Sequence, residues 1–106
     1  MKDNSSHEYY MSRCIEIAKK GIGTTFPNPC VGCIIVYNNI IISEAFSSKY
    51  GGNHAEINAI NNVKEKKILK KSILYVTLEP CSHFGRTPPC CNTIINYKIP
   101  TVIIGA

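Results

Sequence analysis

Residues 72–105, SILYVTLEPCSHFGRTPPCCNTIINYKIPTVIIG, decide the fold. The stretch begins with a strand-like apolar run at 72–78 and ends with a second one, TVIIG, at 101–105. Between them, Pro88-Pro89 suits the start of a helix, which we expect to end near Tyr97, before Pro100. The stretch therefore predicts a strand, a helix and a strand in that order.

The residues before this stretch add a hairpin and two helices. Apolar residues recur at three- and four-residue spacing within 7–20, which predicts an amphipathic helix. Residues 31–37 and 40–46 have the composition of strands, and Asn38-Asn39 between them suits a tight turn. A second helix is expected over 54–63. A hairpin followed by a strand–helix–strand unit implies a central mixed sheet covered by helices, an α/β fold.

The composition is that of a globular protein outside the membrane. The chain has 106 residues, 44% of them hydrophobic and 18% charged, so we expect one domain over 1–106. No apolar run approaches the roughly 18 residues of a membrane span. The first residues lack the apolar stretch of a secretory signal, and Asp3 and Glu8 argue against a transit peptide. We therefore expect a cytoplasmic protein.

The positive charge is concentrated in one short segment. The formal net charge is +5, and the segment KEKKILKK at 64–71 carries +4 of it. Nucleic-acid-binding proteins instead spread basic residues along a face and interleave aromatic ones. We therefore expect a solvated loop whose lysines complement the end of the preceding helix, and no nucleic-acid partner.

Three residues from two separate segments form a candidate metal site. His54 lies at the start of the second expected helix, and Cys81 and Cys90 enclose the proline-rich segment before the third. In a cytoplasmic protein, such thiols point to metal binding or catalysis before disulfides. One imidazole and two thiolates suit tetrahedral zinc, and three protein ligands leave the fourth position to water. This pattern predicts a catalytic zinc site.

Glu56 adds a group that can move protons at this site. Residues two apart on a regular helix point to nearly opposite sides, so His54 and Glu56 can act together only if His54 precedes the helix. Removal of an amine by water needs a proton shuttle, because ammonia must leave protonated. A His-x-Glu motif followed by a Pro-Cys segment is typical of zinc deaminases. Here eight residues separate Cys81 from Cys90 instead of two.

Three motifs together resemble the riboflavin-biosynthesis pyrimidine deaminases, the diaminohydroxyphosphoribosylaminopyrimidine deaminases. The motifs are HAE at 54–56, TLEPCSHFGRTPPC at 77–90 and PNPCVG at 27–32. The resemblance covers almost the whole chain. It implies a cytidine-deaminase-like three-layer α/β/α fold, one zinc ion and hydrolytic deamination of a diaminopyrimidinone ribotide to the matching aminouracil ribotide. By position it assigns the zinc to His54, Cys81 and Cys90, the proton shuttle to Glu56, and substrate contacts to Asn28, His83 and Arg86.

Some features depart from this family. Ser47 stands where these deaminases usually have a histidine near the substrate, and the chain ends before the segment that usually follows the last strand. The reductase domain fused to bacterial members is also absent. We therefore expect either a reductase on a separate polypeptide or a catalytically impaired subunit that keeps the zinc fold. The uncovered last strand favours a homo-oligomer.

Other interpretations of the site residues remain open. Cys81 and Cys90 could join His83 and Cys91 in a structural zinc knuckle, which would leave the HAE motif unexplained, and Cys91 could replace Cys90 as a ligand. Glu56 alone could be a solvent-facing charge at a helix start. A nucleic-acid base deaminase would have the shorter cysteine spacing.

The remaining cysteines and the first histidine have simpler interpretations. Cys30 and Cys33 form a CxxC motif without a second pair at zinc-ribbon spacing, so we expect both to be packed. Cys14 lies in the apolar stripe of the first expected helix and should be in the core. His7 is expected to be solvated.

Overall fold

A four-stranded mixed sheet organises the part of the chain that the computed structural model describes, residues 6–20, 31–46, 54–77 and 94–105. The elements are, in chain order, α1 (Ser6–Lys20), β1 (Gly32–Tyr37), β2 (Ile40–Phe46), α2 (Ala55–Asn62), the 3-10 helix η1 (Lys66–Lys71), β3 (Ser72–Val76) and β4 (Thr101–Ile104). The strand order is β2-β1-β3-β4. Strand β1 is antiparallel to β2 and β3, whereas β3 and β4 are parallel. The predicted mixed sheet is confirmed.

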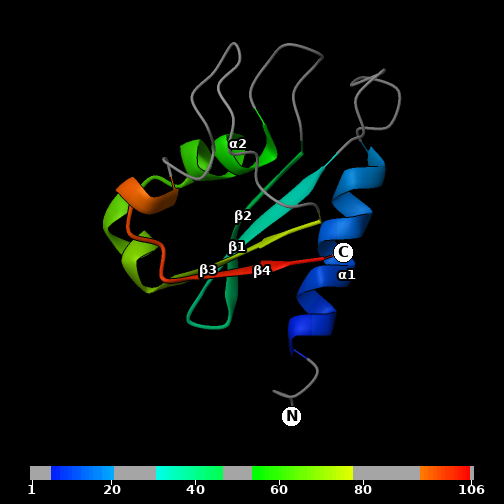
Figure 1. Ribbon diagram of the computed structural model, residues 1–106, viewed down its shortest axis with the longest axis horizontal. Coiled ribbons are helices and arrows are strands. Elements are labelled where there is room, and N and C mark those ends of the chain that lie inside the picture. Colours follow the sequence, from blue (N-terminus) through cyan, green and yellow to red (C-terminus); the bar gives the residue numbers. More distant parts are fainter. Residues whose placement is uncertain (1–5, 21–30, 47–53, 78–93, 106) are drawn as a thin grey trace.

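Two separate cores lie on the two faces of this sheet. Helix α1 covers one face, and α2 with η1 covers the other (Figure 1). Alternate residues of β1 belong to different cores: Ile34 and Val36 pack with α1, whereas Cys33 and Ile35 pack with α2. Because β1 is buried on both faces, its sequence is a continuous apolar run rather than an alternating one. The three-layer arrangement implied by the family resemblance is confirmed.

The hairpin between β1 and β2 has the predicted two-residue turn. Tyr37 pairs with Ile40, and the two residues between them, Asn38 and Asn39, have φ values of 56° and 65°. Two consecutive residues with positive φ define a type I′ turn, whose twist matches that of the flanking strands. Asparagine tolerates this conformation better than other residues with a side chain.

Helix α1 and the start of β1 approach each other closely at Gly32. A Cβ atom added to Gly32 would lie 2.1 Å from the carbonyl oxygen of Cys14 and 2.8 Å from the backbone nitrogen of Ala18. Both distances are shorter than any normal contact, so this position requires glycine. The glycine therefore sets how near α1 lies to the sheet.

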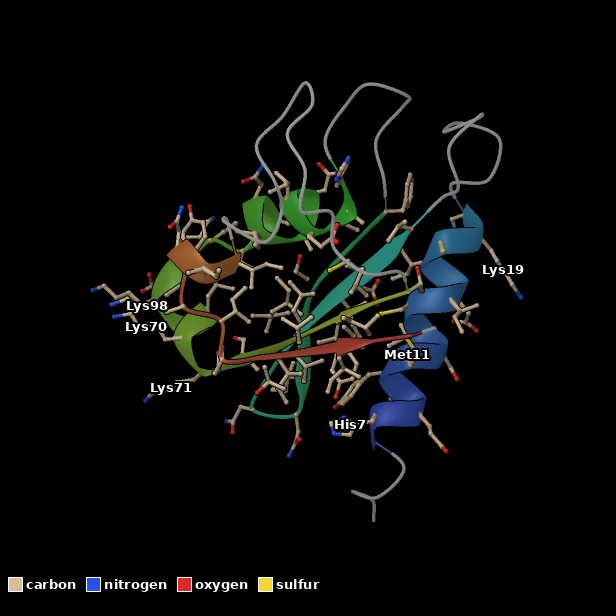
Figure 2. All side chains as sticks on the ribbon, viewed as in Figure 1. His7, Met11, Lys19, Lys70, Lys71 and Lys98 are labelled. Carbon is tan, nitrogen blue, oxygen red and sulfur yellow. The ribbon has the colours of Figure 1, made fainter. Side chains whose placement is uncertain are left out.

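The lysine-rich segment is not the loop that the sequence predicted. Residues 66–71 form η1, because Leu69 is fully buried in the core beneath α2 and fixes the turn that carries it. The expected role at the helix end is confirmed for Lys66, whose Nζ donates a hydrogen bond to the carbonyl of Val63. Lys70, Lys71 and Lys98 lie on the side of the molecule away from α1 (Figure 2).

The third expected helix is described only at its end. Residues 94–96 are helical, and Lys98 follows in the left-handed conformation with φ 60°. The N–H of Ile99 donates to the carbonyl of Ile94 at 3.3 Å, which closes the helix in the manner of a C-cap. This agrees with the predicted end near Tyr97; Pro88-Pro89 lies outside the described residues. None of the helices in the described ranges has the length and apolar character needed to cross a membrane.

Candidate active site

The backbone of His54 has the conformation that the HAE motif requires. His54 is extended, with φ −76° and ψ 164°, and α2 begins at the next residue. Its carbonyl accepts the first helical hydrogen bond, from the N–H of Asn58 at 3.0 Å, and the residue is half-buried. Because His54 lies outside the helical spiral, its separation from Glu56 does not force the two side chains to opposite sides of a helix. The helix was expected to begin at 54 and begins one residue later, so the condition that the HAE motif sets for His54 is met.

Glu56 is the single buried charged residue among those that the structure describes. It is 3% exposed, and the other buried polar residues in these ranges are Ser43 and Ser72. Burial of a carboxylate is unfavourable unless it is paired or hydrogen-bonded, and no buried side-chain nitrogen or oxygen atom in the described ranges lacks a hydrogen-bond partner. The interpretation of Glu56 as a solvent-facing charge is therefore wrong. A buried, partnered carboxylate in the first turn of a helix suits a proton carrier.

The sheet brings two separate segments to the same end. The start of β1 pairs with the end of β2, Gly32 with Phe46, and with the end of β3, Cys33 with Val76. The connection that follows β2 leads to His54, and the connection that follows β3 contains the predicted cysteine ligands. The two connections therefore leave the same end of the sheet, although Phe46 and Val76, after which they begin, are 30 positions apart in the sequence.

Thr77 fixes the point at which the chain leaves β3. Its N–H donates to the carbonyl of Gly32 at 3.1 Å, and its hydroxyl accepts the N–H of Gly32 at 3.1 Å. Thr77 is the last described residue before 78–93. The segment with the predicted cysteine ligands thus begins from a residue that is held to β1 by two hydrogen bonds.

Most of the other predicted site residues lie outside the described ranges. These are Asn28, Cys81, His83, Arg86 and Cys90, together with Cys30, Ser47 and Cys91. Within 6–20, 31–46, 54–77 and 94–105, no three histidine, cysteine, aspartate or glutamate side chains are grouped so that they could hold a metal ion. The ligand set of His54, Cys81 and Cys90, and the substrate contacts, stay predictions.

Two of the cysteines are packed, as expected. Cys14 and Cys33 are both fully buried. The Cys14 thiol donates to the carbonyl of Tyr75 at 3.4 Å, and burial raises the pKa of Cys14 to about 12. Neither residue has the exposed, electropositive surroundings of a reactive cysteine. The predicted core roles of Cys14 and Cys33 are confirmed.

His7 is not simply solvated, in contrast to the sequence prediction. Although the residue is exposed, its Nδ1 atom lies 2.6 Å from the hydroxyl of Tyr75. Burial raises the pKa of Tyr75 to about 12, so this hydroxyl stays protonated and can donate to His7. The contact joins residues 68 positions apart, which is why local sequence reasoning missed it.

The sequence analysis also missed the polar groups that attach α2 to the sheet. The Ser43 hydroxyl donates to the carbonyl of Ala59 at 2.7 Å, and the Asn58 side-chain amide donates to the carbonyl of Phe46 at 2.8 Å. The available signals were a serine within the apolar run of β2 and an asparagine four residues after His54. Both bonds connect the edge strand to the helix that begins at the site.

Known proteins share this fold. Residues 4–106 match the family described as the cytidine and deoxycytidylate deaminase zinc-binding region. Among solved structures, RibD of Acinetobacter baumannii superposes with a TM-score of 0.89 at 40% identity, covering 94% of this chain and 28% of that protein. A deaminase/reductase of Thermotoga maritima superposes with a TM-score of 0.85 at 44% identity, covering 95% of this chain and 29% of that protein. The fold thus defines a cytidine-deaminase-like domain, of a family described by its zinc-binding region.

Another relative, which this chain covers over two thirds of its length, identifies the family within the deaminase class. The diaminohydroxyphosphoribosylamino-pyrimidine deaminase of Buchnera aphidicola from Schizaphis graminum is 54% identical over 106 residues, which are all of this chain and 68% of that protein. The chain therefore belongs to the diaminohydroxyphosphoribosylaminopyrimidine deaminase family, a branch of the cytidine and deoxycytidylate deaminases. It spans between a quarter and a third of the two solved relatives.

Proposed function

We propose that this protein catalyses the hydrolytic deamination of a diaminopyrimidinone ribotide in riboflavin biosynthesis. The observation that carries the proposal is the buried carboxylate of Glu56, 3% exposed, in the first turn of the helix that begins directly after His54. The names of the relatives, which include both the deaminase and RibD of riboflavin biosynthesis, support the choice of substrate. A purely structural zinc site would not need a buried carboxylate beside its histidine.

The residues of the chain fit a zinc ion. His54 is half-buried and its backbone is extended just before α2, so its imidazole does not project from the regular helical spiral. We propose that it binds zinc together with Cys81 and Cys90, a nitrogen and two sulfur donors that match the preference of this metal. When bound, zinc acts as a Lewis acid that makes water a nucleophile at neutral pH.

Glu56 then performs the proton transfers of the reaction. Its carboxylate takes a proton from the attacking water as the new carbon–oxygen bond forms at the amine-bearing carbon. It delivers this proton to the ring nitrogen, then takes the second proton from the new hydroxyl and passes it to the departing amine. The carbon–nitrogen bond breaks as the carbonyl forms, and ammonia leaves. Because Glu56 is shielded from solvent, the protons it carries stay within the site.

The substrate contacts follow from the chemistry of the ribotide. We propose that Arg86 binds the ribose phosphate, because a guanidinium matches a phosphate with two parallel hydrogen bonds. Asn28 and His83 are proposed to contact the pyrimidine and ribose as the family resemblance implies. Ammonia release should not depend on the reductase that uses the product.

The proposal is tested by ammonia release from the diaminopyrimidinone ribotide with zinc-loaded protein. Glu56→Gln keeps the shape of the side chain and removes its basicity, so the variant should keep about one zinc per chain and lose turnover by a factor of about 10² to 10⁴. The matched control is Glu65→Gln, which changes an exposed glutamate beyond the end of α2. This control should have unchanged turnover.

Three results would contradict the proposal. Folded, zinc-loaded protein that releases no ammonia would exclude a self-sufficient deaminase. Unchanged turnover in Glu56→Gln would exclude the shuttle role of this residue. Purified protein without bound zinc, or with four protein ligands to the metal, would exclude the catalytic site itself.

A further inference from the structure

Asn58 makes two hydrogen bonds that connect the start of α2 with the end of β2. Its backbone N–H donates to the carbonyl of His54 at 3.0 Å, and its side-chain amide donates to the carbonyl of Phe46 at 2.8 Å. Phe46 is the last residue of β2, and residues 47–53 connect it to His54. A single residue therefore bridges the two ends of the connection that leads to the site.

The body of α2 is held to the sheet by other contacts. Ala55, Ala59 and Ile60 are buried in the core beneath α2, and the buried Ser43 hydroxyl donates to the carbonyl of Ala59 at 2.7 Å. These contacts fix the distance between the helix and the sheet. The bond from Asn58 is different, because it reaches the end of β2 and so fixes the first turn of α2 along the strand direction.

We propose that Asn58 is a positioning residue for His54 and Glu56. This inference rests on the proposed function, in which His54 binds zinc and Glu56 moves protons. Loss of the side-chain amide of Asn58 would release the end of β2 from the first turn of α2. His54 directly precedes α2, so its imidazole would lose its fixed place relative to the other proposed ligands. Loss of a group that orients a metal ligand typically weakens metal binding by about 10- to 100-fold.

Two substitutions separate this role from a general effect on stability. Asn58→Asp keeps the size of the side chain and replaces the donor by a carboxylate that repels the carbonyl of Phe46. Because position 58 is in the N-terminal half of α2, a negative charge there is compatible with the helix dipole, and the variant should fold. Asn58→Ala removes the bond without adding charge. The control is Ser43→Ala, which removes a different side-chain hydrogen bond between β2 and α2.

Zinc affinity is measured by competition with a chromophoric chelator, and the ligand field by the visible absorption of the cobalt-substituted protein. Both Asn58 variants should bind zinc about tenfold or more weakly, with an altered cobalt spectrum, and should lower kcat with little change in KM. Ser43→Ala should lower the thermal midpoint and leave zinc affinity and the cobalt spectrum unchanged. If the Asn58 variants match the wild type in zinc affinity and cobalt spectrum, the positioning role is wrong.

The controls assign each failure to its cause. Equal losses of zinc affinity in Ser43→Ala and Asn58→Ala would show a general effect of helix attachment and overturn the role of Asn58. A wild-type protein that binds zinc and turns over, with Asn58 variants that behave identically, refutes this inference and leaves the proposed function standing. A wild-type protein that binds no zinc refutes both.

Discussion

Replacing Gly32 by alanine tests how closely α1 packs on the sheet. The added methyl carbon would lie 2.1 Å from the Cys14 carbonyl oxygen and 2.8 Å from the Ala18 nitrogen. Overpacking a core by one methyl group costs about 1–3 kcal/mol. Since both obstructing atoms belong to the backbone of α1, the helix itself must shift, and we expect the upper end of this range, about 3 kcal/mol. For a domain of this size, such a loss lowers Tm by about 12 °C or more.

The matched control is Gly105→Ala. There the added carbon would lie 2.6 Å from the Met11 sulfur, the flexible end of a side chain that can rotate away. We expect a cost below about 1 kcal/mol, partly offset because alanine restricts the unfolded chain. Stability is measured by urea and thermal denaturation followed by far-ultraviolet circular dichroism. If Gly32→Ala were as stable as Gly105→Ala, the proposed close approach of α1 and β1 would be refuted.

Three further predictions concern other contacts. Asn39→Gly should raise Tm by a few degrees, since residue 39 has φ 65° and glycine adopts this value without strain. A lower Tm in thermal denaturation would contradict the assignment of the turn. Arg13 donates two hydrogen bonds to Glu44, at 2.7 and 2.9 Å, and these bonds lower the pKa of Glu44 in the folded protein. The stability that this pair contributes is therefore complete above the ordinary glutamate pKa of about 4.3. It is lost as the pH falls through the lowered folded-state pKa. Arg13→Met should therefore be less stable than the wild type at pH 7 but differ much less in acid, and a difference that is independent of pH in urea titrations would refute this. Because burial raises the pKa of Cys14 to about 12, iodoacetamide at pH 8 should leave this thiol unlabelled in the folded protein and modify it in urea. Labelling is measured by peptide mass spectrometry, and rapid labelling of the folded protein would contradict the burial of Cys14.

Local patterns were sufficient for most of the secondary structure. The three- and four-residue spacing of apolar side chains defined α1, and the pair Asn38-Asn39 located the hairpin turn, because both signals depend on residues that are close in the sequence. The loop predicted over 64–71 was wrong, because the prediction rested on the many lysines and gave no weight to Leu69, which is fully buried. Charge composition describes the exposed side of a segment, and here one apolar residue on the other side decided the structure.

For the candidate site, too, local features could be predicted from the sequence and burial could not. The sequence located the start of α2 to within one residue, and the HAE motif required that His54 precede the regular helix, since this follows from the geometry of a single helical turn. The burial of Glu56 could not be read from the motif, because a glutamate in a first turn is usually exposed and complements the helix dipole there. Burial depends on which segments, distant in the sequence, pack against the helix.

The sequence by itself determined the order of the elements, the hairpin, the α/β class and the motifs of a deaminase. Only the tertiary structure decided that Gly32 admits no side chain, that His7 meets Tyr75, and that Asn58 joins the end of β2 to the first turn of α2. The physical reason is the range of the interactions. Helical periodicity and turn conformation are set by residues a few positions apart, whereas close backbone approach, burial and cross-element hydrogen bonds depend on how the sheet is assembled from distant segments.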